Sequence, residues 1–351
     1  MSERLPKGLA TVAQLAEFDD IIDARSPAEY ADDHVPGARS CPVLSNEERA
    51  RVGMLYKQAS PFAAKKVGAV LVARNVAAHI EAHFLDKPKD WRPLVYCWRG
   101  GQRSGAFSHI LREVGWNAHR LDGGYKSWRR QVIDELEVLP GRLRLRIVSG
   151  ATGSAKSRIL EALATHGAQV LHLEELAAHK GSVLGDLPDA PQPSQKAFES
   201  RLRAALAGFD AERPVFAEAE SRRIGSVYLP NVMIAALRAA PCLRIEATRP
   251  ARVEFLLRDY AYLLADPSRL AAKLELLRSL QGNETVERWL AQVAAGDFRG
   301  LVAELLERHY DAHYQRSQAK NFAGYVEAGA YATDDLSPAG IDSLARRILA
   351  A

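Results

Sequence analysis

Hydrophobic and polar positions in residues 1–137 form short apolar runs separated by longer amphipathic segments. The short runs, in "FDDIID", "PLVYC" and "AHRLD", have the length and composition of buried strands. The longer segments at 46–59, 61–87 and 104–115, and the one that starts at Tyr125, predict helices. Strands that alternate with helices indicate a parallel sheet.

The pattern breaks at "VLPGR", residues 138–142, where Pro and Gly interrupt two periodic segments. Further apolar runs predict strands at 144–150, 213–220 and 240–248. After Arg252 the pattern is almost wholly helical. We therefore predict an α/β domain with a parallel sheet over 1–138 and a second α/β domain over 139–351, with a helical subdomain at about 250–330.

Composition narrows the class of protein without naming a function. A chain of 351 residues can form two domains with proper cores, and a net charge of +4 permits a polyanionic partner without demanding one. The three widely spaced cysteines, Cys41, Cys97 and Cys242, suggest neither a disulfide framework nor a metal site. With no apolar run long enough to span a bilayer and no signal-peptide core, we expect a soluble cytoplasmic protein.

One cysteine has unusual neighbours. In "LVYCWRGGQRSG", Cys97 follows a predicted strand and precedes a predicted helix. The backbone N–H groups between them can curl into an anion-binding nest, to which the helix dipole adds, and this environment favours a nucleophilic thiolate. The candidate anion-binding residues are Arg99, Gly100, Gly101, Arg103 and Ser104. Cys41 and Cys242 lack such surroundings and are expected to be structural.

The segment "IIDARSPAEYADDHVPGA", followed by a strand and this cysteine loop, resembles the rhodanese domain. The matching residues are Asp23, Arg25, Glu29, His34, Pro36 and Gly37. Cys97 takes the place of the persulfide-carrying cysteine. The loop is one residue longer than is usual for sulfur carriers and has the C-x5-R spacing of phosphatases of the same fold. The resemblance therefore implies a phosphate-like donor or a larger chalcogen.

A second motif, "SGATGSAKS" at 149–157, lies between a predicted strand and a predicted helix, as a phosphate-binding loop does. Its amides would cradle phosphates, Lys156 would reach them and Ser157 can face Mg²⁺. Ala155 stands where the standard pattern has Gly, and an alanine can fit there if it keeps a negative φ. The candidate diphosphate-binding residues are Gly150, Thr152, Gly153, Ser154, Lys156 and Ser157, together with Glu218, Arg222 and Arg223 from "EAESRRIG".

Together the two motifs resemble the bacterial tRNA 2-selenouridine synthase family over nearly the whole chain. Further resembling segments are "LDGGYKSWR", "HKGSVLGDL", "PQPSQKAFE" and "HYDAHY". The resemblance implies that geranyl diphosphate alkylates the wobble 2-thiouridine of tRNA, and that selenophosphate, supplied by its synthetase, then replaces the geranyl thiol with selenium.

The resemblance also distributes the substrates over the two motifs. Lys156, Ser157 and the amides of 150–156 would bind geranyl diphosphate, where Mg²⁺ can assist. Arg99, Arg103 and their loop would hold selenophosphate while Cys97 accepts or positions the selenium. No tightly bound cofactor is expected.

The tRNA needs a basic surface, and arginine-rich segments near the predicted domain boundary can supply it. The candidates are Lys126, Trp128, Arg129, Arg130 and Arg144, with Trp128 available to stack on a base. The apolar run "EFLLRDYAYLLA" can hold a geranyl chain, although its pattern is more typical of a protein core.

Other functions remain open on the residues alone. C-x5-R is also a phosphatase spacing, although Tyr96 stands where tyrosine phosphatases have His. A phosphate loop joined to a rhodanese-like domain also fits an ATPase or a small-molecule kinase. A non-catalytic tRNA-binding module would leave the cysteine loop unexplained.

Overall fold

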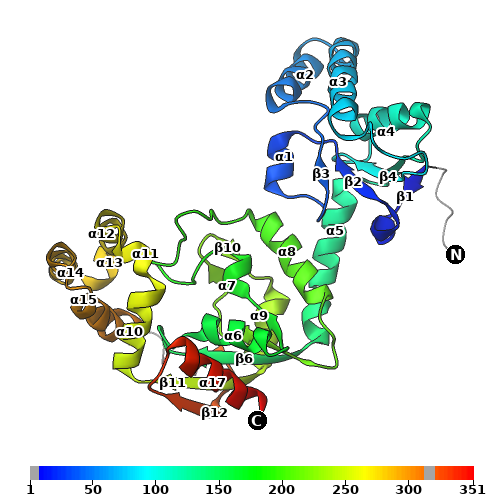
Figure 1. Ribbon diagram of the computed structural model, residues 1–351. Helices are drawn as coiled ribbons and strands as arrows, with labels where there is room; N and C mark the ends of the chain where they lie inside the picture. Colours follow the sequence, from blue (N-terminus) through cyan, green and yellow to red (C-terminus); the bar gives the residue numbers. More distant parts are fainter. Residues whose placement is uncertain (1–7, 312–320) are drawn as a thin grey trace. The chain divides into compact units, whose positions relative to one another are not determined.

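The computed structural model describes residues 8–311 and 321–351. The chain forms two compact units, Met1–Glu135 and Leu136–Ala351 (Figure 1). Both are α/β units built on parallel sheets, which confirms the predicted fold class. Within the described ranges, no helix combines the length and the apolar character needed to cross a bilayer.

Unit 1 is a five-stranded sheet in the order β1-β5-β4-β2-β3, with all described pairs parallel. Its strands are β1 (Leu9–Ala10), β2 (Asp20–Asp23), β3 (Arg39–Ser40), β4 (Pro93–Tyr96) and β5 (His119–Leu121). Its helices are α1 (Pro27–Asp32), α2 (Asn46–Gln58), α3 (Pro61–His83), α4 (Gln102–Val114) and α5 (Tyr125–Leu136), with a short 3₁₀ helix at Val12–Glu17. Each helix predicted from the apolar pattern is present, with ends that differ by a few residues.

A buried ion pair fixes the carboxyl end of β2. Arg25 Nη2 lies 2.6 Å from Asp23 Oδ2, and both side chains are almost fully buried. The Tyr96 hydroxyl, at the end of β4, donates to Asp23 at 2.7 Å. The Arg25 guanidinium also lies 4.0 Å from the ring centre of Tyr125, the first residue of α5. The ion pair therefore ties together the ends of two strands and the start of the helix that follows β5.

Unit 2 contains a second five-stranded parallel sheet, in the order β12-β11-β6-β8-β7. Its strands are β6 (Arg144–Gly150), β7 (Gln169–Leu171), β8 (Pro214–Glu218), β11 (Pro241–Ala247) and β12 (Gly324–Thr333); β9 (Arg223–Ile224) and β10 (Val227–Tyr228) form a separate hairpin. The helices that accompany the sheet are α6 (Lys156–Thr165), α7 (Leu173–Leu176), α8 (Gln195–Ala207), α9 (Asn231–Ala239) and α17 (Pro338–Leu349), after a 3₁₀ helix at Leu139–Arg142.

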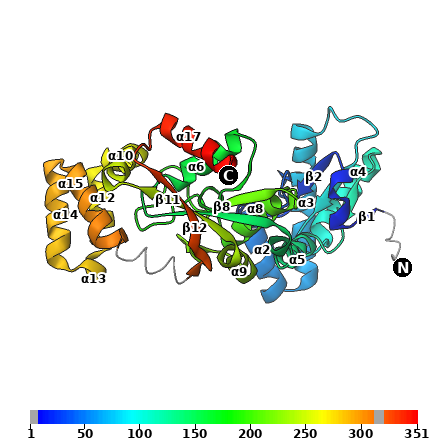
Figure 2. The same cartoon turned by 90° about the horizontal axis from the view of Figure 1, so that it is seen from below.

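Helices cover both faces of this sheet. Leucine and isoleucine side chains of α6 and α17 pack together in one core, and α9 lies on the opposite face (Figure 2). The phosphate-loop motif thus connects the central strand β6 to a helix buried against the sheet. A loop at that edge of a parallel sheet is well placed to bind a ligand.

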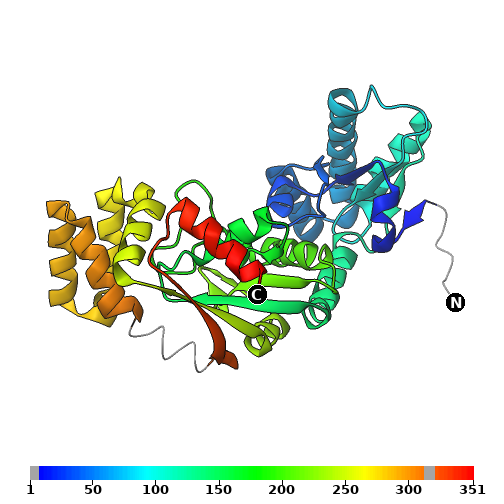
Figure 3. The same ribbon diagram turned by 60° about the horizontal axis from the view of Figure 1, so that its bottom comes forward.

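A helical layer follows β11 and gathers beside the sheet of the same unit (Figure 3). It consists of α10 (Arg249–Asp259), α11 (Ala261–Leu264), α12 (Pro267–Glu275), α13 (Arg278–Gln281), α14 (Asn283–Ala295) and α15 (Phe298–Leu305), and ends in a turn of π-helix at Leu306–Asp311. The layer has its own apolar core around the fully buried Trp289.

The prediction that the chain is almost wholly helical after Arg252 is wrong at β12. Gly324–Thr333 forms the edge strand of the second sheet and pairs with β11 in parallel. Its sequence, "GYVEAGAYAT", contains few bulky apolar residues, because the strand lies at an edge and most of its residues are half-buried or exposed.

Candidate functional site

Cys97 directly follows β4 and is only 3% exposed. Its sulfur lies 3.2 Å from the Ser104 hydroxyl oxygen, which is in the first turn of α4. The thiol is thus held beside a helix N-terminus, where partial positive charge accumulates. The predicted strand–cysteine–helix arrangement is present.

Glycines allow the turn after β5 to pack against the cysteine loop. Gly100 and Gly124 have positive φ values of 66° and 61°. A Cβ atom on Gly124 would overlap the Cys97 carbonyl oxygen, and one on Gly100 would lie 2.7 Å from the Leu121 carbonyl oxygen. Close packing lets the Tyr125 N–H donate to the Cys97 carbonyl at 2.8 Å. The first turn of α5 therefore packs against the cysteine loop and holds the Cys97 carbonyl in place.

The loop offers backbone donors to a ligand. Among the described residues, no acceptor is present for the backbone N–H groups of residues 98–103. Unpaired amides of this kind, next to a helix N-terminus, suit an anion such as a phosphate group.

The two predicted loop arginines differ in their surroundings. Arg99 is exposed. Arg103 forms two hydrogen bonds with Glu29, at 2.7 and 3.2 Å. Burial opposes ionisation of Glu29, but the hydrogen bonds and charge of Arg103 outweigh it and lower the pKa of Glu29 to about 2. Arg103 therefore binds a carboxylate in this structure, and an anionic ligand would have to compete with Glu29 for it.

The second motif forms a phosphate-type loop between β6 and α6. Lys156 Nζ donates to the Gly150 carbonyl at 2.9 Å, and the Ser157 hydroxyl donates to Glu174 at 2.8 Å. Arg252, at the start of α10, donates to the Thr152 carbonyl at 2.7 Å. The loop is therefore closed on internal partners at the positions where phosphate oxygens would bind.

Ala155 does not keep the negative φ at which an alanine would fit without strain. Its φ and ψ are 60° and 27°, in the left-handed region, and not at a negative φ. The turn that leads Lys156 into α6 requires this conformation, and the chain adopts it without glycine. An alanine there carries backbone strain of about 1–2 kcal/mol.

A cavity of 590 Å³ opens beside the loop. Thr152, Gly153, Lys156 and Ser157 line it, as predicted for diphosphate-binding residues. Gly150 and Ser154 are buried behind the loop; the Ser154 hydroxyl has no hydrogen-bond partner among the described residues.

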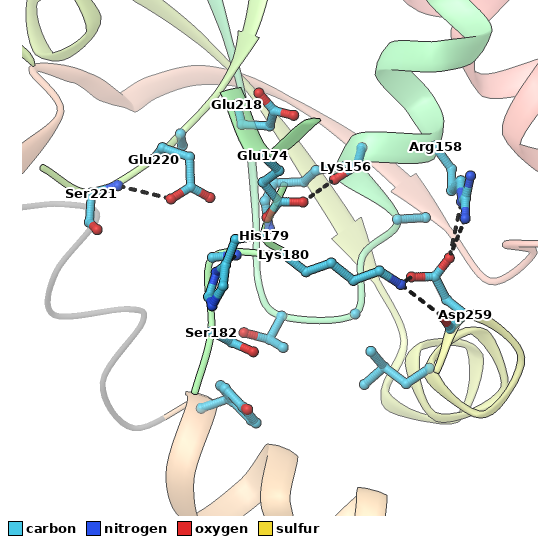
Figure 4. Close-up of a pocket in the computed structure, with 18 of the residues that line it drawn as sticks. Lys156, Arg158, Glu174, His179, Lys180, Ser182, Glu218, Glu220, Ser221 and Asp259 are labelled. Atoms are coloured by element: carbon cyan, nitrogen blue, oxygen red, sulfur yellow. Dashed lines mark hydrogen bonds and ion pairs between the residues drawn. The ribbon is translucent and has the colours of Figure 1, made fainter. Parts of the chain in front are cut away.

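Three carboxylates, Glu174, Glu218 and Glu220, lie around Lys156 in this cavity (Figure 4). Burial raises the pKa of Glu218 to about 8, and the neighbouring Glu174 adds to the shift. Burial and the same neighbour also raise the pKa of Glu220. The pKa of Lys156 is lowered by burial, against the attraction of the three acids. Near pH 7 this cluster therefore holds less negative charge than its composition suggests.

On another side of the cavity, the two cations Lys180 and Arg158 bind the carboxylate of Asp259. Lys180 Nζ lies 2.6 Å from Asp259 Oδ2, and Arg158 contacts the other oxygen of the same carboxylate at 2.9 Å (Figure 4). The Lys180 ammonium also lies 4.3 Å from the ring centre of Tyr260. Within the same segment, His179 Nδ1 accepts a hydrogen bond from the Gly181 N–H at 3.1 Å, so this nitrogen carries no proton.

The sequence reasoning assigned no role to several of these residues. Glu174, His179, Lys180, Asp259 and Arg252 all contact the loop or line the cavity. His179 and Lys180 belong to "HKGSVLGDL", which was singled out only by resemblance. Glu174 and Asp259 stand in ordinary amphipathic segments, where nothing in the pattern marks them.

Two predicted diphosphate-binding residues lie elsewhere. Arg222 and Arg223 are exposed and do not line the cavity. Arg223 belongs to the β9–β10 hairpin, where it donates to the Gly225 carbonyl at 2.6 Å. The structure therefore separates these two arginines from Glu218, which does line the cavity.

The predicted tRNA-binding residues also divide. Lys126 and Arg130 are exposed, and Arg129 is half-buried. Arg144 is exposed and forms an ion pair with Glu212 at 2.7 Å. Trp128 is only 3% exposed, so the expectation that it stacks on a base is wrong. The segment "HYDAHY" extends beyond the described residues at positions 312–314.

Replacing Ala155 by Gly should relieve the strain at φ +60°. The free energy of unfolding should rise by about 0.5–1 kcal/mol, because the relief exceeds the entropy that glycine adds to the unfolded chain. Chemical denaturation measures the change. Ala164→Gly, at an exposed position in the last turn of α6, is the matched control and should instead destabilise, by at most about 1 kcal/mol. Equal losses in both variants would refute the assignment of strain.

The raised pKa of Glu218 predicts a pH-dependent stability. Between pH 4.5 and 8 the native state retains a proton that the unfolded state releases, so this contribution to stability falls as pH rises. Glu218→Gln removes the titration, so the variant should gain roughly 1–3 kcal/mol over the wild type from pH 5 to pH 8.5. Thermal unfolding across this pH range measures the gain. The exposed Glu175→Gln should show a flat difference, and a flat difference at Glu218 would contradict the prediction.

Each of the two units is similar to a known protein family. A family model of the tRNA 2-selenouridine synthase AAA domain matches residues 143–273, and one of the rhodanese-like domain matches 9–131. Curated proteins named tRNA 2-selenouridine synthase are similar along most of the chain. The one from Marinobacter nauticus is 36% identical over 84% of this chain and 87% of its own length, and the one from Alcanivorax borkumensis is 32% identical over 84% and 88%.

A third relative of that name, from Nitrosomonas europaea, is 35% identical over 68% of this chain. That match spans 63% of the relative's own length. The two longer matches cover both units, with identity above 30%. The chain therefore belongs to the tRNA 2-selenouridine synthase family.

Proposed function

We propose that this protein converts the wobble 2-thiouridine of tRNA to 2-selenouridine through an S-geranyl intermediate. The observation that carries the proposal is the presence, in one chain of this family, of two different loops suited to bind anions. One is a loop of unpaired amides around Cys97, and the other is the phosphate-type loop at Lys156. Two chemically distinct phosphorylated substrates would account for both.

The first step is alkylation at the cavity beside the phosphate-type loop. The sulfur of 2-thiouridine attacks C1 of geranyl diphosphate, so that a C–S bond forms while the C–O bond breaks. The diphosphate leaves with the bonding electrons, and the N3 proton of the base passes to solvent. Lys156 and the amides of residues 150–156 would stabilise the charge on the departing diphosphate. Lys156 donates one N–H to the Gly150 carbonyl, and an ammonium group has further N–H donors for a phosphate oxygen.

The carboxylates of the cavity fit an anionic ligand only if they are partly protonated. The raised pKa values of Glu218 and Glu220 favour their neutral forms near pH 7. Neutral carboxyl groups can donate hydrogen bonds to phosphate oxygens instead of repelling them. The cluster is thus compatible with a diphosphate beside it.

The same cavity can accommodate Mg²⁺ as part of a metal–diphosphate complex. In the described ranges, no group of three or more His, Cys, Asp or Glu side chains is arranged to hold a metal by itself. Mg²⁺ usually keeps waters and takes ligands from substrate phosphates and one or two protein oxygens. Ser157 and Glu174, which already contact each other, would supply those oxygens. Bound there, the ion would neutralise charge on the leaving diphosphate.

The second step takes place at the Cys97 loop. The selenium of selenophosphate attacks C2 of the S-geranyl base, and collapse of the adduct expels the geranyl thiolate, which takes up a proton. Water then cleaves the P–Se bond and releases phosphate, leaving 2-selenouridine. The amides of residues 98–103, with Arg99, would hold the phosphate group, and Cys97 would position the selenium. The exposed Lys126 and Arg130 are the described candidates for contact with tRNA.

Lys156→Ala should lower the rate of geranylation at least about 100-fold, because it removes the cation that stabilises the departing diphosphate. Mass spectrometry of tRNA after incubation with geranyl diphosphate measures S-geranyl-2-thiouridine directly. The exposed Lys57→Ala is the matched control and should keep the wild-type rate. Unchanged geranylation in the Lys156 variant would remove this loop from the first step.

Cys97→Ser should stop the conversion of S-geranyl-tRNA to 2-selenouridine while geranylation continues. The readout is the same tRNA analysis, with selenophosphate added. Cys242→Ala, at a cysteine far from both loops in sequence, should leave both steps intact. Equal loss of both steps in the Cys97 variant would indicate a structural role. Turnover of an aryl phosphate by the wild type, lost on this substitution, would indicate a phosphatase instead.

A further inference from the structure

A second cavity, much smaller and apolar, adjoins the one beside the phosphate-type loop. It holds 50 Å³, against 590 Å³ for its neighbour. The two cavities share five lining residues: Thr152, Ser182, Leu256, Tyr260 and Tyr310. The other residues that line the small cavity are seven leucines and Val302. A space walled by aliphatic side chains therefore begins where the anion site ends.

Helix α10 connects the two spaces. Arg252 donates to the Thr152 carbonyl of the phosphate-type loop, and Leu256 lies one turn further along the same helix. A Cβ atom on Gly153 would lie 2.9 Å from Leu256 Cδ1, so the side chain packs directly on the loop. The residues shared by the two cavities include three with hydroxyl groups at the rim, Ser182, Tyr260 and Tyr310. Tyr260 and Tyr310 each form a hydrogen bond with Ser182.

This lining discriminates between classes of phosphorylated ligand. A nucleotide needs polar partners for its base, and the small cavity supplies them only at its rim. An apolar chain gains affinity from such a space, about fourfold for each methylene group removed from water. The geometry fits a ligand with an anionic head and an aliphatic tail.

We propose that the leucine-lined cavity binds the hydrocarbon tail of the diphosphate substrate and limits its length. The assignment of that tail to a prenyl chain rests on the function proposed above. The limited space, less than a tenth of the neighbouring cavity, favours a short chain over a long one. The sequence pattern alone favoured a core role for "EFLLRDYAYLLA"; its Leu256, Leu263 and Leu264 line this cavity.

Two lining residues allow the cavity to be altered with little disturbance of the core. Leu264 and Val302 are half-buried, whereas lining residues such as Leu301 and Leu306 are fully buried. Val302→Phe fills the space, and Leu264→Ala enlarges it. Leu276→Phe is the matched control, because Leu276 is 63% exposed and lines neither cavity.

Isothermal titration of the full chain with inorganic diphosphate, geranyl diphosphate and farnesyl diphosphate tests the proposal without tRNA. In the wild type, geranyl diphosphate should bind at least tenfold more tightly than inorganic diphosphate. Val302→Phe should weaken geranyl diphosphate at least tenfold and change inorganic diphosphate less than twofold. Leu264→Ala should raise the affinity for farnesyl relative to geranyl diphosphate at least fivefold, and Leu276→Phe should match the wild type.

Three results would overturn the proposal. These are equal affinity of the wild type for geranyl and inorganic diphosphate, tighter binding of ATP than of geranyl diphosphate, and wild-type binding profiles in both cavity variants. If a thermal melt shows that Val302→Phe does not fold, the test rests on Leu264→Ala and its affinity for farnesyl relative to geranyl diphosphate. The titration contains no tRNA, so it tests the tail site separately from the tRNA assay described above. A protein that binds the tail in the titration but makes no 2-selenouridine in the tRNA assay refutes only the proposed function. A protein that makes 2-selenouridine with unaltered chain-length preference in both variants refutes only the tail site.

Discussion

Charge buried at the carboxyl ends of parallel strands is the constraint on which both units depend. A buried charge is tolerated only when an opposite charge and hydrogen bonds accompany it. At the end of β2, Asp23 and Arg25 satisfy each other, and the Tyr96 hydroxyl completes the carboxylate. The result is a rigid edge, on which the Cys97 loop lies between β4 and α4. The Cys97 sulfur contacts the Ser104 hydroxyl, which is not part of this ion pair.

The second unit meets the same constraint less completely. Around Lys156, three carboxylates share one ammonium group, and Glu218 Oε1 has no hydrogen-bond partner among the described residues. Burial and the charge of Glu174 raise the pKa values of Glu218 and Glu220. Protonation of these groups then reduces the excess of negative charge. The loop satisfies itself by closing Lys156 on Gly150 and Ser157 on Glu174. A ligand that takes Ser157 or Lys156 from these partners would therefore couple binding to a rearrangement of the loop.

Sequence periodicity predicted the long helices of unit 1 and the strands β2, β4, β5, β6, β8 and β11, because most of these elements bury apolar side chains. The same reasoning, carried further, would have placed Trp128 correctly. Tyr125, Trp128, Val132 and Leu136 are all buried, at the spacing of one helix face. The contact between Arg103 and Glu29 was not predictable in this way, since the two residues are 74 positions apart. The left-handed φ of Ala155 was not predictable either, because the loop, and not the residue's own preference, sets it.

Two features of the second unit bear on the choice between a nucleotide and an amphiphilic ligand. The backbone of the loop keeps the left-handed turn of a phosphate site at Ala155, despite the strain. Strain of this kind persists only where the surrounding structure holds it, which argues that the phosphate site is used. The adjoining small cavity, however, is lined mostly by leucines and not by groups that read a base. The phosphate-type loop would bind the anionic head of the ligand, and the aliphatic cavity would bind the remainder. Recognition of the remainder would therefore distinguish a prenyl transferase from an ATPase that has the same loop.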